Sequence, residues 1–338
     1  MKKSISLLLV LALILSLFAL VGCGGEEGSD NETLSVCVVV SSTFGDKSFN
    51  DSAQEGIERL VEEEGIDVSY IECNNENIKQ NLMDAADTAD IVVAVGWECY
   101  DISDVAPEHP DTKFIWVDNT AENIEEISNL LCITYAQNEG AFLAGYIAAK
   151  MSQTGVVGVV GGEEEDPVVN DFIVGYTQGA EYANPEIQVE TIFAGDYEDP
   201  ALGKECAATL AAKQADIIFN VAGNTGNGIF AAAKEGGFYA IGVDKDQKIS
   251  NPEYDDVIIC SMTKAIGQSV YDVIADYMNN ETWSGGRVWE TDMATGYISI
   301  TYGDEESTQQ ISDDLKAEVE EVASQIVAGE IEVESYEG

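Results

Sequence analysis

The sequence has little histidine, few basic residues and few prolines. Its 338 residues include one histidine, 15 lysines and arginines together, and 6 prolines. The histidine, His109, lies in the polar segment PEHPD, and no Cys-x-x-Cys pair occurs. A zinc centre or a catalytic pair of nucleophile and base therefore lacks its usual residues. We expect no metal ion, no cofactor and no enzyme activity.

The scarcity of basic residues leaves a large acidic excess. The 63 aspartates and glutamates give a formal charge of −48. Without Lys2 and Lys3, which open the chain, the charge becomes −50. Such a surface repels nucleic acid, phosphorylated metabolites and anionic lipid heads. Solubility outside the cell explains it without any partner, and a neutral or cationic small ligand is favoured over a polyanion.

A long apolar run occurs only at the N-terminus, where residues 5–21 follow the two lysines. The run is shorter than the roughly 20 residues of a spanning helix, and it ends in Leu-Val-Gly-Cys. This pattern is typical of bacterial lipoprotein signals, in which Cys23 becomes the lipidated first residue and carries palmitate. An uncleaved membrane anchor and an ordinary signal peptide are the alternatives. We expect residues 1–22 to be the signal peptide and residues 23–33 a flexible tether. Lipid on Cys23 would hold the protein on the extracytoplasmic face of the cell membrane.

The other cysteines do not form a disulfide pattern. Three lie inside apolar, strand-like runs, where a free thiol behaves as a small hydrophobic group: Cys37, Cys132 and Cys260. Three more are scattered: Cys73, Cys99 and Cys206. Free thiols are expected, although the sequence leaves room for one bridge.

The rest of the chain alternates apolar runs with amphipathic segments, as parallel sheets flanked by helices do. Strands are expected at 34–42, 66–72, 90–96, 113–118, 129–135, 155–162, 187–193, 216–223, 238–244, 256–262 and 296–303. Helices are expected at 49–64, 77–89, 138–151, 168–183, 200–213, 229–235, 263–279 and 312–331. Ser312 is a plausible N-cap of the last helix and Gly329 its end.

Two successive α/β series, with elements left over at the end, predict two lobes. The chain would pass from one lobe to the other more than once. The first lobe would hold residues 34–136 plus about 265–298. The second would hold residues 137–264 plus about 299–332. No short-period repeat or low-complexity segment interrupts them.

One stretch, residues 216–247, predicts a ligand site by itself. It reads as strand, glycine loop, helix and strand, with Asp244 at the end of the second strand. Ligands of open α/β sheets bind at the carboxyl ends of strands. The loop glycines Gly223, Gly226 and Gly228 suggest a phosphate loop, but no lysine follows in the Walker manner and the dinucleotide spacing is absent. A loop whose backbone closely approaches an uncharged ligand fits these glycines better than a phosphate loop does.

Several stretches together resemble the basic membrane lipoprotein family of ABC-transporter substrate-binding proteins, whose best understood members are purine nucleoside receptors. They are GDKSFNDSAQEG, FIWVDN, YAQNEGAFLAGYIAA, GVVGGEEEDPVVNDFIVGYTQGA, GDYEDPALGKECA, residues 216–247 and SMTKAIGQSV. The resemblance covers roughly residues 35–330. It implies a type I periplasmic-binding-protein fold of two doubly wound α/β lobes joined by a multi-crossing hinge. It also implies a ligand enclosed between the lobes and delivered to ABC permease subunits by a monomer.

The first lobe would supply four ligand contacts and one possible wall residue. The resemblance implies that Phe49 stacks on a base and that Asp46 and Asn50 bond its edge. The alternative is that Asn50 or Ser48 caps the following helix and Phe49 packs beside it. Asp118, after its strand, matches an aspartate of the family's nucleoside site, although such a residue is often only a turn residue. Trp97 is a possible pocket wall, with core packing the alternative.

The second lobe would supply the remaining contacts. Tyr197 matches the place of a second stacking ring, usually phenylalanine in this family, and Gly223 would offer an N–H or make room. A carboxylate can accept two hydroxyl groups, so Asp244 suits vicinal ribose hydroxyls. Lys264 corresponds to the family's site lysine and would bond the sugar while pairing with Asp244. The alternative for Lys264 is a surface lysine among acids. Asp246 and Gln247 would complete the loop.

These residues predict a lipid-anchored receptor for nucleosides, purine nucleosides first, that feeds an ABC importer. The same receptor type could bind a sugar, a signalling furanose or another small metabolite, since fold does not fix ligand. A sensory lipoprotein and a nucleoside-processing enzyme are further alternatives. The sequence does not separate transport from sensing.

Overall fold

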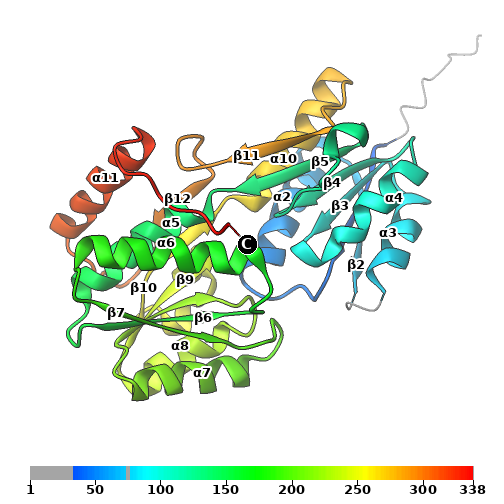
Figure 1. Cartoon of the computed structure of the whole chain (residues 1–338). Coiled ribbons are helices and arrows are strands. Elements are labelled where there is room, and N and C mark those ends of the chain that lie inside the picture. Colours follow the sequence, from blue (N-terminus) through cyan, green and yellow to red (C-terminus); the bar gives the residue numbers. More distant parts are fainter. Residues whose placement is uncertain (1–32, 74–76, 338) are drawn as a thin grey trace, which may run out of the picture. The chain divides into compact units, whose positions relative to one another are not determined.

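The computed structural model describes residues 33–73 and 77–337. The predicted signal peptide, most of the tether and Cys23 lie outside these residues. Residues from Leu34 onward form one compact unit. Two six-stranded sheets organise it (Figure 1).

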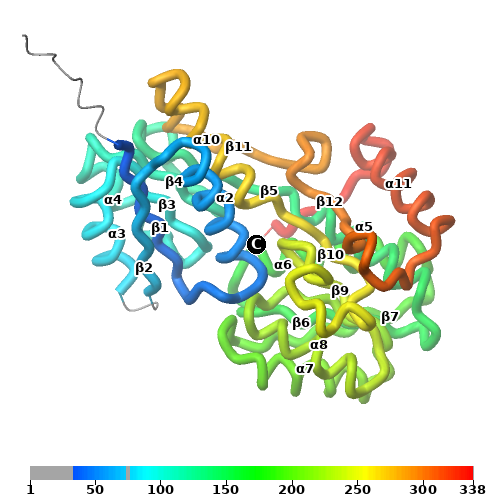
Figure 2. The backbone as a smooth tube through the Cα atoms, turned by 180° about the vertical axis from the view of Figure 1, so that it is seen from behind, coloured from blue at the N-terminus to red at the C-terminus, as the bar shows by residue number. Residues whose placement is uncertain are grey.

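The first sheet has the strand order β11-β5-β4-β3-β1-β2, and its strand pairs are parallel. Its strands are β1 (Ser35–Val40), β2 (Asp67–Glu72), β3 (Ile91–Val95), β4 (Lys113–Val117), β5 (Leu130–Tyr135) and β11 (Arg287–Thr291). Its helices are α2 (Phe49–Glu64), α3 (Ile78–Ala86), α4 (Ile102–Glu108) and α10 (Ile266–Asn280). Helices α2 and α10 cover one face and α3 and α4 the other (Figure 2).

The second sheet has the order β12-β10-β9-β8-β6-β7, parallel except for the edge strand β12. Its strands are β6 (Val156–Gly161), β7 (Gln188–Phe193), β8 (Ile217–Val221), β9 (Tyr239–Asp244), β10 (Ile258–Lys264) and β12 (Ile298–Thr301). Its helices are α5 (Gln137–Met151), α6 (Pro167–Ala183), α7 (Pro200–Ala212), α8 (Asn227–Gly236), α9 (Gln247–Ser250) and α11 (Asp313–Val327). Helices α5 and α6 lie on one face, α7 and α8 on the other (Figure 1).

Short polar side chains and glycines set the helix ends. The carboxylate of Asp166 accepts the amide of Val168 at the start of α6, and Ser312 accepts the amide of Leu315 at the start of α11. Gly237 ends α8 in the left-handed conformation, φ 73°. These are the N-cap and C-cap preferences that let sequence locate helices. The predicted N-cap Ser312 is confirmed.

Several elements differ from the sequence predictions, including the short helix α9, which was not predicted. The helix predicted from residue 263 begins at Ile266, because Thr263 and Lys264 continue β10 and pair with β12. Helix α4 and strand β11 were not predicted. The segment of α4 carries Pro107 and only seven residues, and β11 is a mostly polar edge strand of five residues. Neither shows the strong periodicity on which sequence prediction depends.

Both sheets have a topological switch point at their centre. In the first, the chain runs outward in opposite directions from β1 and β3; in the second, it does so from β6 and β8. Ligands of doubly wound sheets bind at the carboxyl ends of the strands at such a point. The fold therefore points to the loops after β1 and β3 and after β6 and β8.

Candidate functional site

A cavity lies at these strand ends, and its wall includes every residue that the sequence assigned to a ligand. They are Asp46, Phe49, Asn50, Trp97, Asp118, Tyr197, Gly223, Asp244 and Lys264. Residues from both sheets line it, so the loops of the two sheets meet around one space. The structure thus brings together residues up to 218 positions apart in the chain.

The loop after β1 is built around Asp46, which is 3% exposed. Its carboxylate accepts the backbone amides of Ser48, Asn50 and Asp51 at 2.8 to 3.1 Å. Asp46 therefore caps α2, and neither Ser48 nor Asn50 provides the side-chain cap considered from the sequence. Burial raises the pKa of Asp46 to about 7, although the three amides oppose the shift.

Asn50 holds the same loop from inside. Its amide nitrogen donates to Ser42 Oγ at 2.7 Å and to the carbonyl of Thr43 at 2.9 Å. The ring of Phe49 is half-buried against the core beside the cavity. The loop that carries these side chains is therefore fixed before any ligand contact, which lowers the ordering cost of binding.

Lys264 and two aspartates form the charged centre of the cavity. Lys264 is 1% exposed, and its Nζ donates to Asp118 Oδ2, which joins the end of β10 to the end of β4. The sequence paired Lys264 with Asp244, and this pairing is wrong. Thr263, not Lys264, is in register with Asp244, and Lys264 acts on Asp244 only through its nearby charge.

Asp244 is instead held by the first sheet's loop. Its Oδ2 accepts the hydroxyl of Ser48 at 2.6 Å. Burial raises the pKa of Asp244, while the nearby charge of Lys264 and the Ser48 bond oppose the rise. Asp118 and Asp244 both have a positive φ, 73° and 63°. Strained backbone of this kind in non-glycine residues concentrates at functional sites.

Aromatic rings surround the lysine and line the cavity. Lys264 Nζ lies 5.1 to 5.3 Å from the ring centroids of Phe49, Tyr135 and Phe172, within cation–π range. Tyr197 donates its hydroxyl to Asp166 Oδ2 at 2.6 Å. Gly162 leaves the space that this ring occupies, since a Cβ there would overlap it.

Sequence reasoning missed several cavity residues. The most informative are Phe172 and Asp166 on or before α6, and Glu98 after β3. Phe172 belongs to an apolar helix face, and Asp166 with Pro167 is an ordinary helix start, so neither signals a ligand. Glu98 had a usable signal, because it directly follows Gly96 and Trp97 at the end of a buried strand. Burial raises the pKa of Glu98 to about 7 and that of Asp166 to about 6.

Further contacts join the loops of the two sheets. Asn227 donates to the carbonyl of Asp46 at 2.8 Å, and Gln247 donates to that of Lys47 at 3.2 Å. Lys47, with φ 56°, donates its Nζ to Asn251 Oδ1 at 3.0 Å. These residues lie beside the cavity and hold its two sides together.

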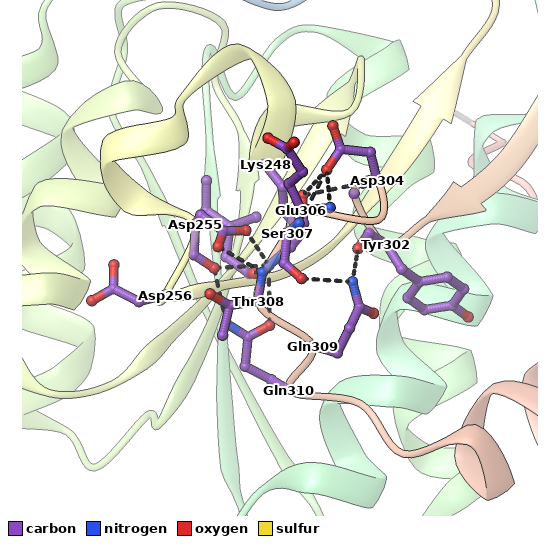
Figure 3. Close-up of polar contacts among 12 residues, drawn as sticks. Lys248, Asp255, Asp256, Tyr302, Asp304, Glu306, Ser307, Thr308, Gln309 and Gln310 are labelled. Atoms are coloured by element: carbon purple, nitrogen blue, oxygen red, sulfur yellow. Dashed lines mark hydrogen bonds and ion pairs between the residues drawn. The ribbon is translucent and has the colours of Figure 1, made fainter.

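Helix α9, which follows Asp244, is anchored by the buried side chain of its own residue Lys248 (Figure 3). Lys248 Nζ donates to the carbonyls of Asp255 and Ile258 at 2.8 and 2.6 Å and to Gln310 Oε1 at 3.0 Å. Asp246 accepts the amide of Lys248 and that of Gly303. The segment between β12 and α11 thus fixes the loop that carries Asp244.

Residues 33–73 and 77–337 contain neither a disulfide nor a metal-binding cluster. The six cysteines there are free and buried, and no group of histidine, cysteine, aspartate and glutamate could hold a metal ion. Within the same ranges, no helix has both the length and the apolar character needed to cross a bilayer.

The chain matches one protein family along almost its whole length. The family model described as "ABC transporter substrate-binding protein PnrA-like" matches residues 33–337. Basic membrane protein A of Borreliella burgdorferi is 33% identical over 337 residues, which cover 97% of each chain. CD4+ T-cell-stimulating antigen of Listeria innocua is 31% identical over 98% of this chain and 99% of its own.

Solved structures agree with the fold. An ABC-transporter solute-binding protein from Aeropyrum pernix K1 superposes with a TM-score of 0.81 at 26% identity, over 90% of this chain and 94% of its own. One from Conexibacter woesei has a TM-score of 0.71 at 24% identity, over 90% of this chain and 99% of its own. The predicted type I periplasmic-binding-protein fold is confirmed.

Proposed function

Because this chain belongs to the PnrA-like family of ABC-transporter substrate-binding proteins, we propose that it binds nucleosides, purine nucleosides first, in the cavity between its sheets. Proteins of this kind bind small molecules and work with permease subunits, and they are not enzymes. The proposed receptor acts as a monomer.

One observation carries the ligand proposal: acceptors for hydroxyl groups lie beside aromatic rings in one cavity. Asp244, with Asp118 and Lys264 next to it, suits the hydroxyls of a ribose, because charge-assisted hydrogen bonds are about twice as strong as neutral ones. Phe49 and Tyr197 supply ring faces for a flat base. Base–aromatic stacking contributes roughly 1–3 kcal/mol per base.

The charges of the cavity support an uncharged ligand. Among the described residues, its wall carries one cationic side chain, Lys264, and six carboxyl groups. The acids are Asp46, Glu98, Asp118, Asp166, Glu198 and Asp244. A phosphate group would be repelled by this wall. A nucleoside fits it better than a nucleotide.

The lobes are proposed as the sequence divides them: residues 34–136 with about 265–298, and 137–264 with about 299–332. The strands of the first sheet come from the first set of residues and those of the second sheet from the second set, which supports the division. Closing such lobes around a ligand is the usual switch of receptors with this fold.

The membrane anchor is proposed from residues outside the described ranges. Lipid on Cys23 would hold the receptor on the extracytoplasmic face, with residues 24–33 as the tether. We expect a Cys23→Ala variant to be lost from the membrane fraction, while the wild type stays there. Equal membrane retention of the two proteins would contradict the anchor.

Mass spectrometry of ligand released from the purified protein tests the ligand proposal. We expect the mass of a nucleoside after the protein is unfolded, since a closed receptor retains its ligand. Release of a sugar or another metabolite in stoichiometric amount would replace the nucleoside by that compound and leave the receptor function intact.

A further inference from the structure

Glu98 lies where the two central strands of the first sheet end. It follows Gly96, whose φ is 112°, and a Cβ on Gly96 would come within 2.8 Å of Glu98 Oε2. The missing side chain thus leaves room for the carboxyl group to fold back over the strand end. Ser41, just after β1, donates its hydroxyl to Oε2 at 3.0 Å. Glu98 is therefore fixed at the switch point of the first sheet, on the cavity wall.

Three other acids of the cavity have both carboxylate oxygens bonded to protein donors. Asp46 accepts three amides, and Asp166 accepts the Val168 amide and the Tyr197 hydroxyl. Glu198 accepts the amide and the hydroxyl of Thr43. Each of these carboxylates already accepts a hydrogen bond on both oxygens.

Glu98 is different, because among the described residues the Ser41 hydroxyl, on Oε2, is its one donor from another residue, beside its own backbone amide. Asp118, by contrast, has the ammonium of Lys264. Burial is the main cause that raises the pKa of Glu98 to about 7, and the charges of Asp166 and Glu163 raise it further. A partly buried carboxylate with one donor from another residue is costly, and a ligand N–H would reduce that cost.

We propose that Glu98 is a specificity-determining residue, which accepts hydrogen bonds from N–H groups on the edge of the base and makes the site prefer guanine and hypoxanthine. The inference rests on the proposed nucleoside function and names the substrate class of the same cavity. Guanine offers two parallel N–H groups, at N1 and the exocyclic N2, which match the two oxygens of a carboxylate. Hypoxanthine offers one, at N1. A purine without substituents offers none on that edge.

The test compares guanosine, inosine and purine riboside by titration calorimetry at pH 8, where a carboxyl group with a pKa of about 7 is ionised. We expect the wild type to bind guanosine most tightly and purine riboside least. Glu98→Gln should weaken guanosine and inosine roughly 10- to 100-fold, since a charge-assisted bond is lost. Purine riboside should change less than about threefold, because it makes no such bond.

Glu198→Gln is the matched control, since it removes a charge from the same cavity at a carboxylate already bonded to Thr43. It should change the three affinities alike. A Glu98→Gln protein that loses affinity equally for all three ligands, or for none, overturns the role of Glu98 while the nucleoside function stands. A folded wild type that binds none of the three overturns the nucleoside function itself, and the role of Glu98 with it.

Discussion

Replacing Lys264 by methionine is expected to lower the free energy of unfolding by about 3–5 kcal/mol, because it leaves the Asp118 carboxylate buried without its partner. The side chains of this ion pair are 1% and 8% exposed, so water cannot replace the lost ammonium. Asp244, which Lys264 also stabilises through its charge, would become harder to ionise. Chemical denaturation at neutral pH measures the change.

A double variant separates the ion pair from simple loss of packing. Lys264→Met with Asp118→Asn removes both charges, and asparagine tolerates the positive φ of position 118. The double variant should be more stable than Lys264→Met alone by about 1–3 kcal/mol, since no unpaired charge remains. A single variant that costs less than about 1 kcal/mol would show that the pair is not the buried centre described.

Replacing Asp244 by asparagine is expected to weaken ribonucleoside binding roughly 10- to 150-fold. This range corresponds to the about 1.5–3 kcal/mol of a hydrogen bond to a charged group. Asparagine keeps the shape, the Ser48 contact and the tolerance of φ 63°, whereas alanine would add backbone strain. Titration calorimetry with one ribonucleoside measures the change.

The 2′,3′-dideoxy analogue of the same nucleoside is the control ligand. It lacks the hydroxyls that Asp244 would accept, so the wild type should bind it weakly and Asp244→Asn should bind it almost equally well. Equal losses for the ribonucleoside and the dideoxy analogue would place Asp244 elsewhere than at the sugar.

Most of the fold could be predicted because parallel sheets leave a strong pattern in the sequence. Buried strand β3 is a continuous apolar run and β8 is apolar except for Asn220, and the helices between the strands are amphipathic or end at a cap. The failures are local. Lys264 was predicted in the following helix, but its pairing with β12 extends β10 through it. Strand β11 is a mostly polar edge strand whose place depends on contacts with β5.

Strand ends marked one part of the candidate site, the family resemblance marked Phe49 and Asn50 on α2, and residues within other helices gave no signal. Asp118, Asp244 and Lys264 each end a strand or follow one directly, so topology alone brings them together. Phe172 comes from within α6, and its position depends on how that helix packs, which periodicity does not give. The Lys264–Asp118 pair joins two sheets, and the sequence holds no information on which of two nearby acids the lysine meets.

Titration calorimetry of the wild-type protein with inosine, guanosine and adenosine tests the central claim most directly. We expect at least one of them to bind with a Kd in the micromolar range or tighter, at one ligand per chain. A folded protein that binds none of the three more tightly than millimolar would contradict the nucleoside proposal and leave a receptor of this family for another small molecule.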